Sequence, residues 1–302
     1  MRDLDLTTLR LFVTVCETRN IARAGEQASI VGSAISKRLA ALEDTVGTPL
    51  LLRRRRGVVP TPAGETLLEH ARAMLASADQ IERDMAAYAA GVKGQVRILA
   101  TASAIAESLA DDVAAFLTDP AHRDIQIDIE ERVSSGVLRG LKEGSASVGI
   151  CWDNADLEGL HTHPWRSDHL AVVTPKAHPL ARHKTLRLAQ ALGYEQVSLP
   201  PSSAVRIMLQ RAAARTGQSI KYRVVVATFE AALRVVRAGL AISVLPVELA
   251  QPYAAAFGLA IIPLTDPWAQ RRFAICVRDE ATLSTAARLL VAHLARCGEP
   301  QP

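Results

Sequence analysis

The sequence is poor in aromatic residues and in cysteine. Phe, Trp and Tyr together make up 4% of the 302 residues, whereas hydrophobic residues make up 49%. Leu, Val, Ile and Ala must therefore build the cores, and a chain of this length is expected to hold two or three domains. Cys16, Cys151, Cys276 and Cys297 show no C-x-x-C spacing, which argues against a zinc site or a disulfide framework. A redox-sensing thiol stays an alternative.

Long apolar runs and common catalytic motifs are also missing. No window approaches the ~20 apolar residues of a membrane span, and the first residues lack the apolar core of an export signal. We therefore expect a cytoplasmic protein without a membrane partner. No G-x-S-x-G, H-E-x-x-H or phosphate-loop motif is present, so an enzyme is not expected. The five histidines between residues 161 and 183 lack a Cys or carboxylate at ligand spacing, so neither a metal nor another cofactor is expected.

Positive charge is concentrated at one end of the chain. The sequence holds 35 Lys and Arg against 31 Asp and Glu, a net charge of +4. Residues 1–64 contain ten of these basic and six of these acidic residues, which leaves 25 of each sign elsewhere. A basic end on a neutral body predicts that only this end meets a polyanion.

A helix is predicted over residues 33–46 by apolar residues at 4-3-4 spacing. The apolar residues are Ile35, Leu39, Leu42 and Val46. Ser33, Lys37 and Ala40 fall on the opposite face, with Ser36 on its flank, and this face has no carboxylate. A small, weakly basic face of this kind can enter a DNA groove without like-charge repulsion, although an ordinary surface helix has the same pattern.

The neighbouring segments favour the DNA-binding interpretation. A first helix is indicated by Leu6, Leu9, Val13 and Cys16, and a short helix over residues 21–28 follows Asn20, a typical N-cap. An extended run at 49–52, four arginines with Gly57, and a second extended run at 58–61 come next. A helix pair, a strand, an arginine-rich turn and a returning strand form a winged helix-turn-helix. The arginines are then expected to clamp phosphates of double-stranded DNA.

A long helix follows the wing. Thr61 can cap it, Pro62 suits its first turn, Glu65 favours its positive end, and Gly91 and Gly94 are expected to end it. Its apolar or small residues alternate at gaps of 4 and 3: Leu67, Ala71, Met74, Ala78, Ile81, Met85 and Tyr88. This period predicts a coiled coil that forms a homodimer, with packing onto its own body as the alternative. A homodimer with two reading heads implies two-fold-related DNA half-sites.

From residue 95 onward the pattern changes to alternating strands and helices, which predicts an α/β body. Strands are expected at 96–100, 125–129, 148–151, 169–174, 194–199, 222–227, 242–246, 259–262 and 273–277. The clearest helices are expected at 104–117, 204–215 and 283–296, with others ending near 142 and 239.

Turns that carry Ser or Thr follow four of these strands. Helix N-termini at the carboxyl ends of parallel strands form a crevice that favours anions, although Ser and Thr cap helices everywhere. As a set they predict a cleft for a small molecule, a carboxylate being one candidate. The residues concerned are Thr101, Ala102, Ser103, Ser134, Ser135, Ser202, Ser203, Thr228 and Phe229.

A dense signature lies in the first 64 residues: Leu9-Arg10-Leu11-Phe12, Ala24, Glu26, Ala34-Ile35-Ser36-Lys37, Leu42-Glu43, Gly47, Pro49-Leu50-Leu51, Arg53, Arg56-Gly57, Thr61 and Ala63-Gly64. With this signature the N-terminal sixty-odd residues resemble the LysR-type transcriptional regulators, and the rest of the chain fits that family's effector-binding body. The resemblance implies a winged helix-turn-helix over residues 1–61 and a dimerising linker helix over 62–91. It also implies two subdomains like those of type-2 periplasmic binding proteins, over 92–164 plus 267–302 and over 165–266.

The resemblance further implies a homotetramer that binds near promoters, with RNA polymerase a candidate partner, and that responds to a metabolite between the subdomains. Val31-Gly32-Ser33 replaces the family's common Ser-Gln-Pro, Gly25 replaces an alanine, and Ser147 stands where aspartate is common. DNA contacts are therefore expected from Ser33, Ser36, Lys37, Arg38, Arg53, Arg54, Arg55, Arg56 and Thr61.

Two other classes of protein fit parts of the sequence. A solute-binding protein for transport would use the body but would need an export signal and no DNA-binding end. A DNA-binding architectural or repressor protein of the same fold, without a small-molecule response, would show DNA affinity independent of metabolites.

Overall fold

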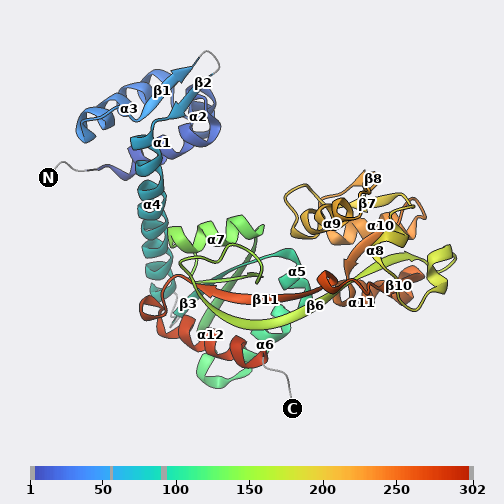
Figure 1. The fold of residues 1–302 in the computed structure, drawn as a ribbon. Coiled ribbons are helices and arrows are strands. Elements are labelled where there is room, and N and C mark those ends of the chain that lie inside the picture. Colours follow the sequence, from blue (N-terminus) through green and yellow to red (C-terminus); the bar gives the residue numbers. More distant parts are fainter. Residues whose placement is uncertain (1–3, 55–56, 90–93, 299–302) are drawn as a thin grey trace. The chain divides into compact units, whose positions relative to one another are not determined.

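The computed structural model describes residues 4–54, 57–89 and 94–298 (Figure 1). The chain forms two compact units. The N-terminal unit covers Met1–Gly91, with which Lys142–Ser145 are grouped, and the C-terminal unit covers Val92–Leu141 and Ala146–Pro302.

The N-terminal unit has the expected winged helix-turn-helix. Its elements are α1 (Leu6–Thr18), α2 (Ile21–Ala28), α3 (Gly32–Val46), β1 (Leu51–Arg54), β2 (Gly57–Pro60) and α4 (Pro62–Ala89). Asn20 caps α2 as predicted, because its side-chain oxygen accepts hydrogen bonds from the backbone N–H groups of Ala22 (2.9 Å) and Arg23 (3.2 Å). Asp5 caps α1 in the same way, through the N–H groups of Thr7 and Thr8.

The core of this unit is formed by α1, α3 and the first half of α4. Its buried residues include Leu9, Phe12, Val15, Ile35, Leu39, Leu42, Leu68, Ala71 and Leu75. Burial of such side chains contributes about 1.5–3 kcal/mol each. Val46 and Leu6 belong to the apolar stripes that were expected to be buried, but they are 42% and 40% exposed. Both lie at helix ends, beyond the packed centre, and Gly47 (φ +79°) already turns the chain away after Val46.

The wing is an antiparallel hairpin in which Leu51 pairs with Pro60 and Arg54 with Gly57. Arg53 and Arg54 therefore belong to strand β1, and placing them in the bend was wrong. Gly57 (φ +129°) allows the hairpin to approach α1, because a Cβ atom there would lie 2.1 Å from the carbonyl oxygen of Arg19. That oxygen accepts a hydrogen bond from the Val58 N–H (3.0 Å).

Glu43 of α3 holds the start of the wing. Its Oε1 atom accepts hydrogen bonds from the backbone N–H groups of Leu50 (2.7 Å) and Leu51 (3.1 Å). A charged acceptor of this kind contributes about 1.5–3 kcal/mol per hydrogen bond, so it couples the wing firmly to the helix pair.

Helix α4 begins as predicted and is described to Ala89; Gly91, where it was expected to end, lies outside the described residues. Thr61 caps it, since its hydroxyl accepts from the Gly64 N–H (3.0 Å) and donates to the Pro49 carbonyl (2.8 Å). Beyond the core, Met74, Ile81 and Met85 of the seven-residue repeat are 41%, 63% and 57% exposed within this chain.

The C-terminal unit is the expected α/β body. Its strands are β3 (Gly94–Ala100), β4 (Ile125–Glu131), β5 (Val148–Trp152), β6 (His161–Pro175), β7 (Gln196–Ser198), β8 (Tyr222–Val225), β9 (Ser243–Pro246), β10 (Leu259–Pro263) and β11 (Gln270–Val277). Its α-helices are α5 (Ala102–Ala104), α6 (Ala110–Thr118), α7 (Ser134–Glu143), α8 (Leu188–Ala191), α9 (Ala204–Arg215), α10 (Phe229–Arg237), α11 (Val247–Phe257) and α12 (Thr285–Cys297). A π-helical turn η1 (Ile105–Leu109) joins α5 to α6, and the 3-10 turns are η2 (Pro120–His122), η3 (Pro179–Arg182), η4 (Pro267–Ala269) and η5 (Glu280–Thr282).

Two long strands connect two hydrophobic cores. The sheet order is β10-β6-β11-β5-β3-β4, with β9 also paired to β6, and β7 pairs with β8 in parallel. The first part of β6 pairs with β11, and its last part pairs with β9 and β10, so β6 runs from one core to the other beside β11 (Figure 1). One core lies among β3, β5, β11, α6 and α12, with α7 on the opposite sheet face. The other lies among β6, β9, β10, α9 and α10.

Several elements differ from the predicted ones. Strand β6 begins earlier than the expected 169–174. Its first half was not predicted because this half is polar and lacks apolar alternation. Helix α11 was missed because Pro252 stands in its interior, where proline normally breaks a helix. Within the described ranges, no helix is both long enough and apolar enough to cross a membrane.

Candidate functional site

The outer face of α3 matches the predicted reading face. Ser33, Lys37 and Ala40 are exposed and Ser36 is half-buried, while the opposite side packs into the core. Val31, at the N-cap position, is 71% exposed and gives the helix no side-chain hydrogen bond. The first backbone N–H groups of α3 are therefore without a side-chain cap.

Gly25 shapes the turn between α2 and α3. A Cβ atom there would lie 2.5 Å from the carbonyl oxygen of Ile30, and the Ile30 N–H donates to the Gly25 carbonyl (2.9 Å). The backbone of the turn therefore approaches α2 more closely than an alanine would allow. This close approach is the physical reason for glycine at this position.

Two of the predicted DNA-contacting residues already have partners within the unit. Arg38 Nη1 lies 3.1 Å from Asp5 Oδ2 and 3.2 Å from the Thr8 hydroxyl, and the Thr61 hydroxyl is engaged in capping α4. Arg53 and Arg54 are exposed on β1. Arg55 and Arg56 lie outside the described residues.

The C-terminal unit contains a cleft of about 350 Å³ where the predicted turns converge. Its wall comprises Thr101, Ala102, Ser103, Ile105, Ala106, Glu131, Arg132, Val133, Ser134, Leu199, Pro200, Ser202, Ser203, Ala204, Ala227, Thr228, Phe229 and Glu230. The structure therefore brings together every predicted cleft residue except Ser135, which is exposed elsewhere on α7.

The hydroxyl groups of the cleft differ in what they do. Thr228 caps α10, since its hydroxyl accepts a hydrogen bond from the Ala231 N–H (3.2 Å). Thr101 and Ser203 also precede helices, but their side chains make no capping hydrogen bond. Thr101 and Ser103 are only 8% and 7% exposed. Both residues belong to the cleft wall, where a bound ligand would meet them.

Charged residues at the rim were missed by the sequence analysis. Glu131 ends β4, Arg132 follows it, and Glu230 lies in the first turn of α10. Arg132 forms an ion pair with Glu130, and Glu230 pairs with Arg234 (2.7 Å). Arg132 could have been found by the rule that identified Thr101, because both follow directly after a strand of the parallel part of the sheet.

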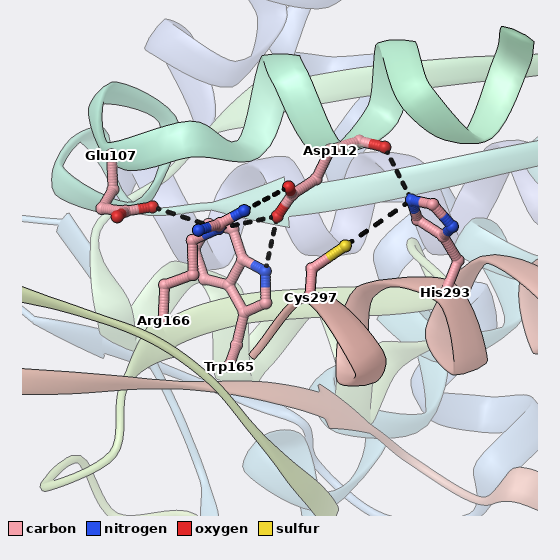
Figure 2. A network of polar contacts seen from close by, with 6 residues as sticks. All are labelled: Glu107, Asp112, Trp165, Arg166, His293 and Cys297. Carbon is pink, nitrogen blue, oxygen red and sulfur yellow. Dashed lines mark hydrogen bonds and ion pairs between the residues drawn. The ribbon is translucent and has the colours of Figure 1, made fainter. Parts of the chain in front are cut away.

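A polar network ties one wall of the cleft to β6 and α12 (Figure 2). Asp112 of α6 accepts hydrogen bonds from Trp165 Nε1 (3.0 Å) and from Arg166 Nε (3.0 Å) and Nη2 (2.6 Å). His293 Nε2 lies 3.0 Å from the Asp112 carbonyl oxygen. Glu107, on the π-helical turn beside the cleft, lies 3.6 Å from Arg166, and burial raises the pKa of its carboxyl group. Turns of this kind often mark functional segments.

Two of the four cysteines lie in surroundings that oppose the thiolate form, and two of the histidines have protein partners. Burial raises the pKa of Cys16 to about 11 and also raises that of Cys297, so neither favours the reactive thiolate. His163 pairs with Glu280 (2.8 Å), and His169 bonds the Leu264 carbonyl (2.7 Å). Within the part of the chain that the structure describes, no three His, Cys, Asp or Glu side chains are grouped to hold a metal ion.

Comparisons with known proteins agree with this architecture. Residues 6–65 match the family model for the bacterial regulatory helix-turn-helix protein of the lysR family, and residues 89–298 match the LysR substrate binding domain. The chain is 26% identical over 293 residues to the uncharacterized HTH-type transcriptional regulator YbhD of Escherichia coli (strain K12), covering 96% of this chain and 90% of that one. It is 31% identical over 192 residues to the probable regulator LrrA of Synechococcus elongatus, covering 64% of each.

Solved structures show the same fold. The crystal structure of CbnR, a LysR family transcriptional regulator, has a TM-score of 0.67 at 22% identity and covers 98% of this chain and all of that one. The effector binding domain of QuiR in complex with shikimate has a TM-score of 0.60 at 19% identity, covering 68% of this chain and 97% of that domain.

A winged helix-turn-helix joined to an α/β effector-binding body defines a DNA-binding transcriptional regulator. The two matched family models together span most of the chain. The chain belongs to the LysR family.

Proposed function

We propose that this regulator binds promoter DNA at two-fold-related half-sites as a homodimer, and that a small molecule in the cleft changes this binding. The convergence of Thr101, Ser103, Ser134, Ser203 and Thr228 on one cleft carries the proposal. These residues come from segments far apart in the sequence, and simple helix capping does not require them to meet. In this proposal the domains cover 1–61, 62–91, 92–164 plus 267–302, and 165–266.

For DNA, we assign the major-groove contacts to the acid-poor face of α3 and the phosphate contacts to the wing. Ser33, Ser36 and Lys37 are the direct readers, and Arg53 and Arg54 clamp the backbone. Arg38 and Thr61 contribute by positioning, because their side chains already have protein partners. Full-length CbnR, whose fold this chain shares, has been solved in complex with its target DNA.

For assembly, we assign dimerisation to the exposed stripe of α4. Met74, Ile81 and Met85 repeat at coiled-coil spacing and remain exposed within one chain. A second copy would bury them and present two reading heads. A homotetramer, contact with RNA polymerase and a cytoplasmic location belong to the same proposal, since a regulator of this kind acts at promoters.

For the effector, we infer a small molecule with hydroxyl or carboxylate groups and an apolar part. Most of the cleft wall is apolar, Thr101 and Ser103 offer hydroxyl groups, and Arg132 is the cation among the described wall residues. The molecule would bridge both cores and shift the population of their arrangements. The QuiR domain in complex with shikimate supports a small-molecule role for this fold.

A panel of small carboxylates, including benzoate and shikimate, tests the cleft by thermal unfolding of the full chain. A ligand at 100 times its dissociation constant stabilises the folded state by about 2.7 kcal/mol. A ligand that raises the melting temperature of the wild type should fail to do so for Thr101→Ala with Ser103→Ala. Ser135→Ala is the matched control and should keep the response. If the control lost the rise in melting temperature, or the double variant kept it, the effector would not bind in this cleft.

A further inference from the structure

The C-terminal unit has a second cavity, of about 460 Å³, which shares no residue with the effector cleft. Its wall comprises Trp152, Asp153, Asn154, Met208, Arg211, Ala212, Arg215, Trp268, Gln270 and Arg272. These residues come from the end of β5, the later turns of α9, the turn η4 and the start of β11. The cavity therefore lies where both hydrophobic cores border the long strands.

The wall of this cavity has an excess of positive charge. Arg211 and Arg215 are exposed, lie one turn apart on α9, and form no ion pair with any residue that the structure describes. Arg272 faces the same cavity, and its Nε lies 3.1 Å from Asp153 Oδ2. The wall thus contains three guanidinium groups and one carboxylate, and that carboxylate is paired with Arg272. Like charges at this helical spacing repel, so an anion in the cavity would relieve the repulsion.

The position of Arg215 can be explained without a ligand. It lies in the last turn of α9, where a cation is favoured by the helix dipole. That explanation does not extend to Arg211, which lies a turn earlier, or to Arg272 on another element. The shared cavity is what these three residues have in common.

Two indole rings complete the wall. Trp152 and Trp268 are half-buried, and both pack against the core formed around β6, β9 and α9. Anchored indoles provide flat apolar surfaces on which a planar group can stack, and arginines bind carboxylate or phosphate groups in a bidentate manner. Met208 and Ala212 are buried and add apolar surface to the wall.

We propose that this cavity is a second ligand site, which binds a planar small molecule carrying two or more negative charges. The ring lies against the indoles, and Arg211, Arg215 and Arg272 hold the charged groups. Aromatic dicarboxylates and mononucleotides share this chemistry. The site itself does not depend on the effector cleft.

Helix α9 links the second site to the cleft, and this part of the inference rests on the proposed function. Ser203 and Ala204 at the start of α9 line the cleft, while Arg211 and Arg215 line the second site. Eight residues separate Ser203 from Arg211, roughly 12 Å along a helix. A ligand that draws the end of α9 towards β11 would also move its start, so each ligand would change the affinity of the other by the same factor.

Tryptophan fluorescence of the full chain provides the test. Trp152 and Trp268 line the cavity, and Trp165 is 4% exposed in the other core. Titration with benzene-1,2-dicarboxylate or with AMP should give a saturable change, and whichever binds tighter identifies the charged group as carboxylate or phosphate. Arg211→Gln with Arg215→Gln should weaken that binding at least about tenfold. Arg182→Gln, an exposed arginine of η3, is the matched control and should leave it unchanged.

Three results would overturn the second site. One is saturable binding that the double variant leaves unchanged. Another is equal affinity for pyrophosphate, which has no ring. The third is loss of binding together with a change in oligomeric state on size-exclusion chromatography, which would make this face an interface between copies. Thr101→Ala with Ser103→Ala should leave the titration unchanged, so failure here and failure of the effector cleft are separate outcomes.

Discussion

Asp168 and Arg271 face each other directly on β6 and β11, the two strands that connect the cores, and form a two-pronged ion pair. Arg271 Nε lies 2.7 Å from Asp168 Oδ1, and the two side chains are 1% and 0% exposed. Burial raises the pKa of Asp168, and Arg271 offsets part of that rise. Since β6 and β11 both run between the two cores, this buried pair ties together the strands that connect them.

Removing Arg271 should strongly destabilise the C-terminal unit. Arg271→Met leaves the Asp168 carboxylate buried without its partner, which typically costs about 3–5 kcal/mol in the free energy of unfolding. Asp168→Leu with Arg271→Met removes both charges and should recover most of the loss. Urea unfolding of the full chain measures both variants.

The matched control for this prediction is Arg223→Gln. Arg223 of β8 pairs with Glu195, the residue directly before β7. The side chains are 52% and 51% exposed, so the loss in the free energy of unfolding should stay below about 1 kcal/mol. If Arg271→Met cost no more than this control, the buried pair would not hold the strands together.

Glu248 should make the stability depend on pH in the opposite sense to an ordinary paired carboxylate. It lies in the first turn of α11, and burial, together with the charge of Asp168, raises its pKa above 4.5. Ionisation is therefore harder in the folded state, and the resulting loss of stability begins as the pH rises past 4.5 and is complete above the raised pKa.

Glu248→Gln keeps an acceptor oxygen and cannot ionise. Its free energy of unfolding should be close to that of the wild type near pH 4 and higher than that of the wild type at pH 7. Urea unfolding at both pH values measures the difference. A difference that stayed constant with pH would mean that Glu248 is not the titrating group.

Local patterns explain why much of the fold could be predicted from the sequence. Asn20 and Thr61 mark helix starts because their side chains satisfy nearby N–H groups, and such contacts span only a few residues. Thr101 and Ser134 could be placed near one another because they follow β3 and β4, parallel neighbours whose carboxyl ends lie at one sheet edge.

Contacts that depend on tertiary packing could not be predicted. Asp168 and Arg271 are 103 residues apart, and their pairing depends on the register of β11 against β6, which no local pattern fixes. The second cavity was missed for the same reason, since Trp152, Arg211 and Trp268 meet only after three separate segments pack. The exposed position of Val46 also depends on where the core ends rather than on helical periodicity.

Arg54 in the wing should contribute to DNA affinity without affecting sequence preference. Its side chain is exposed on β1. The slope of log K against log salt is negative, and the loss of one phosphate contact reduces its magnitude by about 0.9. Arg54→Ala should therefore weaken binding to specific and unrelated duplexes alike and flatten the salt dependence. Lys184→Ala, an exposed charge of the C-terminal unit, is the control. If the salt dependence of Arg54→Ala had the same slope as that of the wild type, Arg54 would not contact DNA phosphates.

The exposed stripe of α4 should control assembly. Ile81→Glu with Met85→Glu places charges where two helices are proposed to meet, and each buried apolar side chain contributes about 1.5–3 kcal/mol. The dimer dissociation constant should rise at least about 100-fold, as measured by analytical ultracentrifugation. Glu69→Lys, on a different face of the helix, should leave it unchanged. A double variant that assembled like the wild type would support packing of α4 onto its own chain instead.

The affinity of Lys37→Glu for duplex DNA from the region upstream of its own gene tests the reading face most directly. This change puts a carboxylate on the acid-poor face of α3, and binding measured by fluorescence anisotropy should weaken at least about 100-fold. Lys184→Glu makes the same charge change on an exposed residue of the C-terminal unit and should bind like the wild type. If Lys37→Glu bound as tightly as that control, α3 would not be the element that reads DNA.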